Sequence, residues 1–561
     1  MDNLISSNGP DGHRNKSDAT VVQIPLTEST IMNQYDHRAN GKNQTNSQNG
    51  PFIKNIQPVL MSPNKLNQAI KEAKEAFRTG RTKDVRFRKK QLRQLLKLLE
   101  ERKDEICQAL KDDLNKPAFE TTLCEYNLMR NDIYELLHLL DDFVKPESKG
   151  KSLLTFFDDV YVKNEPLGTV LVMGAWNYPL LLSLQPVAGA IAAGNCVIIK
   201  MSEHSPHIGQ LLADLIPQYL DQDCYKVINC DLPTSQYMLA EHKFDHIFYT
   251  GGDNGGKAVY TAASKNLTPV VLELGGKSPV YIDDDVCDRE SVWTRLFWGK
   301  FINAGQTCVA PDYVLCSEKA QQMARKHFSK VMDQFYNGDP INSEHYPRIV
   351  NAQQFERLKK LVKESPMIVG GKLQPEKLSI EPAIVLDVTV DDPIMQQEIF
   401  GPILPFVTCP SVQRAIDIIN SRPKPLALYI FSQSRKTQEK FLTETSSGGV
   451  CINDTVLQLS TASLPFGGVG GSGFGKYHGR YTLDCFSNQR AVLSRGFNPI
   501  LEWIGSNRYP PYTSTKLTIL TQLGLNRKLW LPGPLLTNCL AFATGVGSVF
   551  AYQFISSTTI I

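Results

Sequence analysis

Between Val160 and Leu274, short β-rich runs alternate with segments of helical spacing, and this alternation constrains the fold more than any other feature. The runs are GTVLVMG from Gly168, CVIIK from Cys196, KVIN from Lys226, HIFYTG from His246 and PVVLELGG from Pro269. Stretches such as PVAGAIAAG and HIGQLLADLIPQYL separate them. The alternation is typical of βαβ units and predicts an α/β fold, with a parallel sheet that has helices on both faces.

In such sheets, ligands bind at the carboxyl ends of the strands, where several of these runs reach Gly or Lys. No GxGxxG fingerprint follows a strand, so an ordinary dinucleotide-binding assignment is not made from this region alone. The nearest glycine-rich strand-to-helix turn is TGGDNGGK, Thr250–Lys257. A helix N-terminus at this turn would favour an anionic group.

A second α/β region is expected from about Asp283 to Phe486. Its strand-like runs are YVLC from Tyr313, AIVLDV from Ala383, LPFVTC from Leu404 and PLALYIFS from Pro425. The stretch LPFGGVGGSGFG, 464–475, is too glycine-rich for regular structure and predicts a close-packed loop near a ligand. Upstream of both regions, apolar residues at three- and four-residue steps predict a long amphipathic helical region over 84–114.

The two ends of the chain differ from its middle. Residues 1–57 are rich in Asn, Ser, Gln, Thr and Gly, so we expect a disordered polar tail. No charged residue follows Lys528, and Leu535–Ile555 is largely apolar, about the roughly 20 residues that a bilayer span requires. The segment 529–561 is therefore predicted to be a hydrophobic tail that anchors the protein in a membrane. The alternative is a buried C-terminal segment or a helix that lies on a partner.

Composition excludes several classes of function. A net charge of +3 in 561 residues gives no electrostatic argument for binding nucleic acid. The 12 cysteines form no CxxC motif or Cys/His cluster, so we expect reduced thiols, with neither a metal site nor a disulfide framework. The first residues lack the patterns of a secretory signal and of a mitochondrial presequence, which predicts a protein facing the cytoplasm.

The stretch FINAGQTCVA, 301–310, holds one cysteine in a small-residue, nearly uncharged loop. Gly305 leaves room for a flat group to approach the backbone, and Gln306 and Thr307 are polar without charge. Cys308 offers a polarisable nucleophile. A lone cysteine is otherwise a small buried hydrophobe, so the nucleophile hypothesis depends on motifs elsewhere in the chain.

Four motifs occur in order along the chain: GAWNYP from Gly174, LELGGKSP from Leu272, AGQTCVAPDY from Ala304 and EIFGPILP from Glu398. Together they resemble the aldehyde dehydrogenase superfamily. RPKPLALYIFS, LPFGGVGGSGFGKYHG and RYPPYTSTKL are most similar to its class 3 branch. The likeness covers roughly residues 58–520, and the apolar tail makes the chain resemble the membrane-anchored fatty aldehyde dehydrogenases of that branch.

The resemblance implies three catalytic residues. Cys308 matches the family nucleophile, which forms a thiohemiacetal and then a thioester with the aldehyde. Asn177 matches the amide that, with the backbone N–H of Cys308, donates to the oxyanion; one such donor is worth about 3 kcal/mol. Glu273 matches the general base, and its place at the end of an apolar strand would raise the carboxyl pKa by desolvation. On the residues alone, a turn residue before a proline is the favoured interpretation of Asn177, and an ion pair, for instance with Lys277, is the alternative for Glu273.

The resemblance also implies NAD as cofactor, with NADP left open. The KPSE turn that holds the adenosine ribose appears here as KMSE, and the TGS of the pyrophosphate loop appears as TGG. EIFGP matches the pair that holds the nicotinamide ribose and backs the ring. The expected cofactor-binding residues are Lys200, Glu203, Gly251, Gly252, Gly256, Glu398 and Phe400.

For the architecture, the resemblance implies a Rossmann-like cofactor domain over 58–280, which carries part of a small oligomerisation element. An α/β catalytic domain would follow over 281–486, with an oligomerisation or linker segment over 487–528. Members of the family are commonly dimers, so we expect a homodimer.

The predicted substrates are medium- to long-chain aliphatic aldehydes, because an enzyme held at a bilayer meets aldehydes that partition into lipid. Tyr126, Asn127, Tyr178 and Phe466 are candidates to line an apolar access tunnel, and His478 is expected to be structural. The cytoplasmic face of the endoplasmic reticulum is the expected location. The alternatives are a broad aromatic and medium-chain aldehyde dehydrogenase, a cofactor-independent thiol hydrolase and a non-enzymatic protein that retains the fold.

Overall fold

The structure is a computed structural model that describes residues 59–365 and 367–525, together with residues 541, 544 and 548. The chain divides into two units, Met1–Pro51 and Phe52–Ile561, and every described residue belongs to the second.

Two predictions from the sequence fall on the ends of the chain. The segment 1–57 lies outside the described residues, as do all but three residues of the proposed anchor, 529–561. Within the described part of the chain, no helix has the length and apolar composition that crossing a membrane requires.

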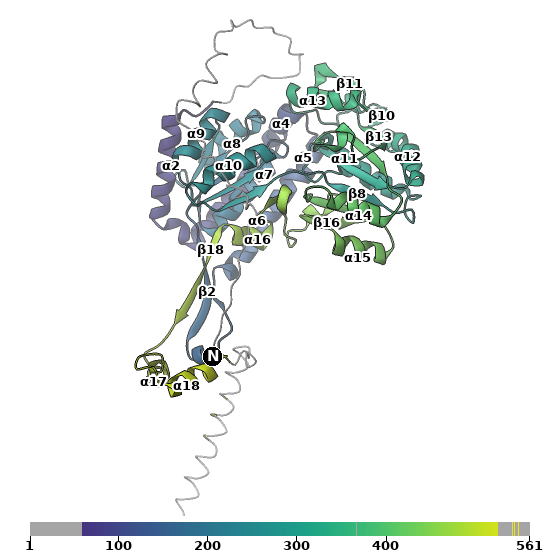
Figure 1. Cartoon of the computed structure of the whole chain (residues 1–561). Helices are drawn as coiled ribbons and strands as arrows, with labels where there is room; N and C mark the ends of the chain where they lie inside the picture. Colours follow the sequence, from purple (N-terminus) through teal and green to yellow (C-terminus); the bar gives the residue numbers. More distant parts are fainter. Residues whose placement is uncertain (1–58, 366, 526–540, 542–543, 545–547, 549–561) are drawn as a thin grey trace, which may run out of the picture. The chain divides into compact units, whose positions relative to one another are not determined.

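The predicted parallel sheet is present, and each expected run forms a strand (Figure 1). Its strand order is β17-β7-β6-β3-β4-β5, and all neighbours are parallel except β17 and β7. Every residue of β3 and β4 is buried, which requires cover on both faces of the sheet. The strands are β3 (Thr169–Met173), β4 (Cys196–Lys200), β5 (Tyr225–Ile228), β6 (His246–Thr250), β7 (Val270–Glu273) and β17 (Gly473–Phe474).

The helices around this sheet share one apolar core with it. α7 is apolar on all sides and almost completely buried, as expected of a helix at the centre of a core. The amphipathic region over 84–114 forms two helices, α3 and α4, which meet at Arg102. The helices are α2 (Pro63–Arg78), α3 (Val85–Glu101), α4 (Lys103–Leu114), α6 (Asn127–Phe143), α7 (Pro179–Ala193), α8 (Pro206–Tyr219), α9 (Leu232–Glu241), α10 (Asp253–Ser264) and α16 (Gly479–Cys485).

A second sheet has the order β10-β13-β14-β9-β8-β15-β16 and its own apolar core. All neighbouring strands are parallel except β10 and β13. The strands are β8 (Pro279–Ile282), β9 (Tyr313–Cys316), β10 (Ile368–Gly370), β13 (Ala383–Val388), β14 (Ile403–Thr408), β15 (Ala427–Phe431) and β16 (Gly449–Ile452). The helices of this region are α11 (Glu290–Phe301), α12 (Glu318–Tyr336), α13 (Ala352–Lys363), α14 (Val412–Asn420) and α15 (Arg435–Glu444).

A third, antiparallel sheet has the order β1-β2-β18. Its strands are β1 (Glu147–Ser148), β2 (Asp159–Pro166) and β18 (Ser487–Ser494), and they join segments more than three hundred residues apart (Figure 1). The helices α17 (Pro499–Ser506) and α18 (Ser514–Leu525) follow.

The glycine-rich stretch differs from its prediction. Gly473–Phe474 is not irregular: it forms β17 and pairs with β7, with Gly473 opposite Glu273. A β-carbon built on Gly473 would stand 1.9 Å from the carbonyl oxygen of Leu272, so only glycine allows this approach. After β17 the chain packs α16 against α6 and α7, so the residues 473–486 join the first sheet and its core.

The strand order also locates the ligand-binding end of the first sheet. The chain runs from β3 outward to β4 and β5, then returns to β6 on the other side of β3. A crevice for ligands is expected where the order reverses, at the carboxyl ends of β3 and β6. Gly174 follows the first of these strands and Gly251 follows the second.

Candidate active site

The loop that carries Cys308 begins where α11 ends, and its backbone is held in a left-handed conformation. Asn303, Ala304 and Gly305 have φ values of 52°, 51° and 73°. Such values are unfavourable for alanine, so the surroundings have to enforce them. Hydrogen bonds do so: the Asn303 N–H donates to Glu120 Oε2 (3.1 Å), and Asn303 Nδ2 donates to the carbonyl of Gln306 (3.1 Å).

Two residues of this loop are structural in a way that the sequence did not show. On the side where a β-carbon of Gly305 would lie, the close neighbour is protein backbone, since that β-carbon would stand 2.3 Å from the carbonyl oxygen of Gly401. The Gln306 side chain links the loop to the backbone at residues 348–350. Its Oε1 accepts from the Val350 N–H (2.9 Å), and its Nε2 donates to the carbonyls of Asn303 and Arg348.

Asn177 lies directly against this loop. It stands between β3 and α7, and only 3% of it is exposed. Its Nδ2 donates to the carbonyl of Gln306 (3.1 Å), and its own carbonyl accepts from Asn303 Nδ2 (2.9 Å). An amide nitrogen carries two hydrogens, and one of them is used by Gln306, two residues before Cys308. The second N–H of Asn177 is left for another acceptor.

A buried ion pair behind Asn177 was not predicted from the sequence. Lys116 and Glu125 are both fully buried and lie 2.5 Å apart. Lys116 Nζ also donates to the carbonyl of Asn177 (2.8 Å), while Glu125 Oε2 accepts from the first free N–H groups of α7, those of Leu180 and Leu181. A carboxylate is favourable at a helix N-terminus, so the pair fixes both the start of α7 and the backbone of Asn177.

Cys308 is partly exposed, and two acidic residues lie near enough to affect its thiol. Desolvation raises the pKa of Cys308 to about 12, and Glu398 and Glu273 add to the rise. The structure therefore brings together Cys308 from the second sheet region and Glu273 from the end of β7.

Glu273 is a buried carboxyl group in the same site. Only 3% of it is exposed, and neither carboxyl oxygen has a hydrogen-bond partner among the described residues. Desolvation raises the pKa of Glu273 well above its ordinary value, and Lys476 opposes the rise. The alternative pairing with Lys277 is not present, because Lys277 pairs with Asp312 and also donates to the carbonyls of Ile394 and Gln397.

Glu398 and Phe400 lie on the same side of the site. The Glu398 carboxyl packs on Gly275, where a β-carbon would stand 2.1 Å from Oε2. Desolvation raises the pKa of Glu398 to about 8, with Asp312 as the next cause. Phe400 meets the ring of Trp176 edge to face, with ring centroids 5.3 Å apart.

Lys200 and Glu203 lie together at the end of β4. Lys200 Nζ donates to Glu203 Oε2 at 2.7 Å, and the lysine side chain is 8% exposed. Burial raises the pKa of Tyr249 to about 12, with the charge of Glu203 as the next cause. The Lys200–Glu203 pair follows β4 and the glycine turn at Gly251 follows β6, the two strands that flank β3.

The glycines of that turn have different surroundings. A β-carbon on Gly251 would stand 2.3 Å from the Tyr249 hydroxyl, whereas nothing lies within 4 Å of one on Gly252, the residue that caps α10. Gly256 packs on Leu274 (2.7 Å), so it permits close contact between helix and strand. An open backbone at a helix N-terminus beside a crevice fits the pyrophosphate of a dinucleotide.

The other candidates are mostly part of the core. Tyr126 and Tyr178 are 6% and 7% exposed, and the Tyr178 hydroxyl lies 2.7 Å from Thr307 Oγ1. Phe466 packs against both apolar cores and stacks on His478. Burial lowers the pKa of His478 to about 4, as expected of a structural histidine. Asn127, at the start of α6, is partly exposed.

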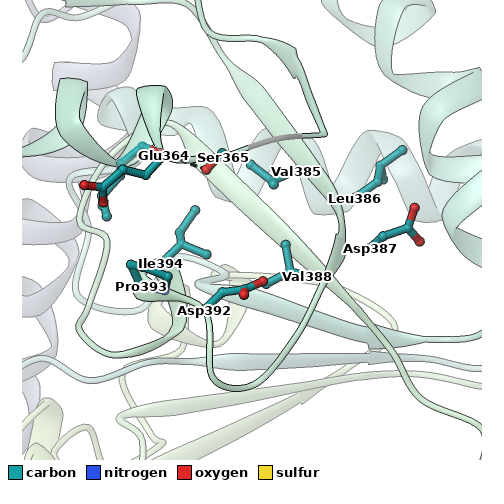
Figure 2. Close-up of a pocket in the computed structure, with 10 residues that line it drawn as sticks. Glu364, Ser365, Val385, Leu386, Asp387, Val388, Asp392, Pro393 and Ile394 are labelled. Atoms are coloured by element: carbon teal, nitrogen blue, oxygen red, sulfur yellow. Dashed lines mark hydrogen bonds between the residues drawn. The ribbon is translucent and has the colours of Figure 1, made fainter.

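Figure 2 shows a surface pocket away from these residues, where Ser365 and Val385 face Ile394. None of the predicted site residues lines it. In the part of the chain that the structure describes, no group of three or more acidic, cysteine or histidine side chains could hold a metal ion.

Comparisons with known proteins agree with this geometry. The family model for the aldehyde dehydrogenase family matches residues 43–492. Human aldehyde dehydrogenase family 3 member B1 is 45% identical over 455 residues, which cover 81% of this chain and 96% of the relative. The dimeric NADP-preferring aldehyde dehydrogenase of Rattus norvegicus is 44% identical, covering 80% and 98%. The substrate-bound structure of Staphylococcus aureus AldH superposes with a TM-score of 0.78 at 39% identity, covering 82% and 99%.

The chain therefore belongs to the aldehyde dehydrogenase family, and it is an oxidoreductase that acts on aldehydes with NAD(P) as cofactor. Within that family it is similar to members of family 3, which confirms the resemblance predicted from the sequence motifs.

Proposed function

We propose that this protein oxidises medium- to long-chain aliphatic aldehydes to carboxylic acids, with Cys308 as nucleophile, Asn177 as oxyanion donor and Glu273 as general base. The observation that carries the proposal is the contact of Asn177 with the loop of Cys308, where its Nδ2 donates to the carbonyl of Gln306. The charge of Glu273 also contributes to the raised pKa of the Cys308 thiol. NAD is proposed as the principal cofactor, bound along Lys200, Glu203 and the turn at Gly251.

In the first half of the reaction, the sulfur of Cys308 adds to the aldehyde carbon and forms a thiohemiacetal. NAD(P), when bound, supplies the hydride acceptor and a positive charge next to the site. The thiol has to lose its proton before it attacks, and a nearby positive charge favours the thiolate. The free N–H of Asn177 and the backbone N–H of Cys308 then donate to the oxygen that gains charge. A neutral donor suits this step, because it does not prevent the collapse of the oxyanion.

In the second half, a water molecule attacks the thioester on Cys308. Glu273 takes the proton from that water as the water oxygen bonds to the acyl carbon. The carbon–sulfur bond then breaks with its electron pair on sulfur, the acid is released, and the proton returns from Glu273 to the Cys308 thiolate. A carboxyl whose pKa burial has raised is a stronger base than an exposed one, and no described residue hydrogen-bonds to the oxygens of Glu273, which leaves them available to water.

The preference for long aliphatic chains rests on the C-terminal region. Large apolar side chains are exposed just before the proposed anchor: Phe497 is 95% exposed, Tyr512 80%, Leu517 68% and Trp503 67%. Trp and Tyr favour the interface between membrane and water. These residues lie on α17, α18 and the segments beside them, close in sequence to the uncharged tail 529–561.

We also propose a homodimer, and a location on the cytoplasmic face of the endoplasmic reticulum. The rat relative is named as dimeric. β18 has β2 as its partner on one side only within the third sheet, and an edge strand of this kind can accept a second chain.

A chain-length panel on the full chain and on a variant without residues 529–561 tests the proposal. We expect kcat/KM to rise with aliphatic chain length, and the truncated protein to leave the membrane fraction while it keeps its activity on short aldehydes. A preference for aromatic or short aldehydes in both forms would favour the broad-specificity alternative. Truncated protein that still sediments with membranes would contradict the anchor.

A further inference from the structure

Glu273, the proposed general base, does not form the ion pair with Lys277 that was the alternative interpretation of the sequence. Lys277 is fully engaged by Asp312 and two backbone carbonyls, so it does not face Glu273. Both oxygens of Glu273 are buried without a hydrogen bond among the described residues. A buried carboxylate needs a compensating charge in order to ionise at neutral pH.

Lys476 is the residue that can supply this compensating positive charge. It follows β17, the strand that pairs with β7 opposite Glu273. Its Nζ donates to the carbonyl of Gly467 and, at 3.3 Å, to the carbonyl of Gly448. It is half-buried rather than enclosed.

Gly467 brings the two side chains together. A β-carbon built on Gly467 would stand 2.9 Å from Glu273 Oε1 and 3.0 Å from Lys476 Cδ. The carboxyl and the lysine stem therefore border one position on the glycine loop. The ammonium lies beyond Cδ on a flexible stem, so rotation about its last bonds can turn it from the backbone carbonyls toward Glu273.

We propose that Lys476 is the positioning residue of the general base: its charge keeps Glu273 able to ionise and holds the carboxylate on the water that cleaves the thioester. The proposal rests on the proposed function of Glu273. In this step, water oxygen bonds to the acyl carbon, the carbon–sulfur bond breaks, and the water proton passes to Glu273.

Among the described titratable groups that interact most strongly with Glu273, Lys476 is the candidate for this role. The titratable groups that interact electrostatically with Glu273 come from three elements: Cys308 from the nucleophile loop, Lys476 and Tyr477 after β17, and Cys485 from α16. Of these, Lys476 alone is positive when it is charged. Desolvation lowers the pKa of Lys476, and the charge of Glu273 opposes that fall, as expected of two groups that border the same glycine.

The test measures hydrolysis of the acyl-enzyme without any cofactor. p-Nitrophenyl acetate acylates the thiol of Cys308 and releases nitrophenolate, after which deacylation is followed from pH 5.5 to 9.5 in the full chain. For Lys476→Met we expect the midpoint of the deacylation profile to move up by about one pH unit, with about tenfold slower deacylation below it. Lys476→Arg should restore the wild-type midpoint. Lys424→Met is the matched control, since Lys424 borders the same loop at Gly470 and should leave the profile unchanged.

A uniform loss of rate in Lys476→Met without a shift of the midpoint would show a merely structural role and overturn the proposal. Wild-type protein that yields no acyl-enzyme would instead contradict Cys308 as nucleophile. For that case an infrared titration of the Glu273 carboxyl, taken as a difference from Glu273→Gln, gives an independent readout. Lys476→Met should raise that titration midpoint, and an unchanged midpoint would again overturn the proposal.

Discussion

Two buried glutamates of the candidate site, Glu125 and Glu273, have opposite surroundings. Glu125 is fully buried and receives hydrogen bonds from Lys116 and from two N–H groups of α7. Glu273 is 3% exposed and receives none from the described residues. Burial of a charged group is costly unless partners compensate it. The first glutamate therefore supports the structure, whereas the second keeps its basicity for a reaction.

The difference in hydrogen bonding between the two glutamates corresponds to two roles in the site, structural support for Glu125 and chemistry for Glu273. The Lys116–Glu125 pair holds the backbone around Asn177, so the oxyanion donor is fixed before substrate arrives. Glu273 is held by its strand instead: its carbonyl accepts from the Gly251 N–H, and the next N–H donates to the Ser472 carbonyl. The strand thus fixes the main chain of Glu273, while its carboxyl oxygens have no hydrogen-bond partner among the described residues.

The largest expected effect comes from replacing the sulfur of Cys308, the proposed nucleophile. Cys308→Ser should lower aldehyde-dependent NADH formation by about a thousandfold or more, because a serine hydroxyl without an adjacent activating base is a poor nucleophile. Steady-state absorbance at 340 nm measures it. Cys316→Ser, a buried thiol on β9, is the control for general damage to the second core. Comparable loss in both variants would contradict a specific role for Cys308.

Glu273→Gln separates the two halves of the reaction. We expect one rapid burst of NADH, followed by a steady rate about a hundredfold lower, since loss of a general base typically costs 10²–10⁴-fold. Stopped-flow absorbance resolves the burst from the steady phase. An unchanged steady rate would remove Glu273 from the mechanism.

Much of this frame was predictable from the sequence. The strand runs from Thr169 to Glu273 formed as expected, because β-branched and apolar residues with intervening glycines specify buried parallel strands locally. The motif residues Asn177, Glu273 and Cys308 were found because each stands in a short, distinctive run of neighbours.

The residues that orient those groups could not be found in this way. Lys116 lies in a turn after α4 and Glu125 in the next helical segment, and only the tertiary fold brings both to α7. For Gly305, a sequence does not show which backbone approaches the glycine, here that of Gly401. Lys277 was the alternative ion-pair partner of Glu273, but it pairs with Asp312 of the second sheet region.

Lys116→Met tests the structural member of the comparison. Removing one partner of a buried ion pair leaves an uncompensated charge on Glu125, so the free energy of unfolding should fall by about 3–5 kcal/mol. Chemical denaturation measures the loss. The double variant Lys116→Met/Glu125→Leu should recover part of it, because no buried charge then remains. A single variant within about 0.5 kcal/mol of wild type would mean that the pair does not support Asn177.

The smallest effect concerns stability as a function of pH, where the two glutamates should respond differently. Burial raises the pKa of Glu273 in the folded state, so folding holds its proton more tightly than the unfolded chain does. This contribution to stability is complete below the unfolded pKa and is lost as the pH rises through the folded one. The glutamine of Glu273→Gln stays neutral at every pH, so the Tm of this variant relative to wild type should be higher at pH 9 than at pH 6.

Glu125→Gln should lower Tm at both pH values, because it removes the partner of Lys116 and weakens the cap of α7. An equal change of Tm for Glu273→Gln at pH 6 and pH 9 would mean that solvent or an ion already compensates this carboxylate, and the contrast between the two glutamates would then be one of position rather than of charge.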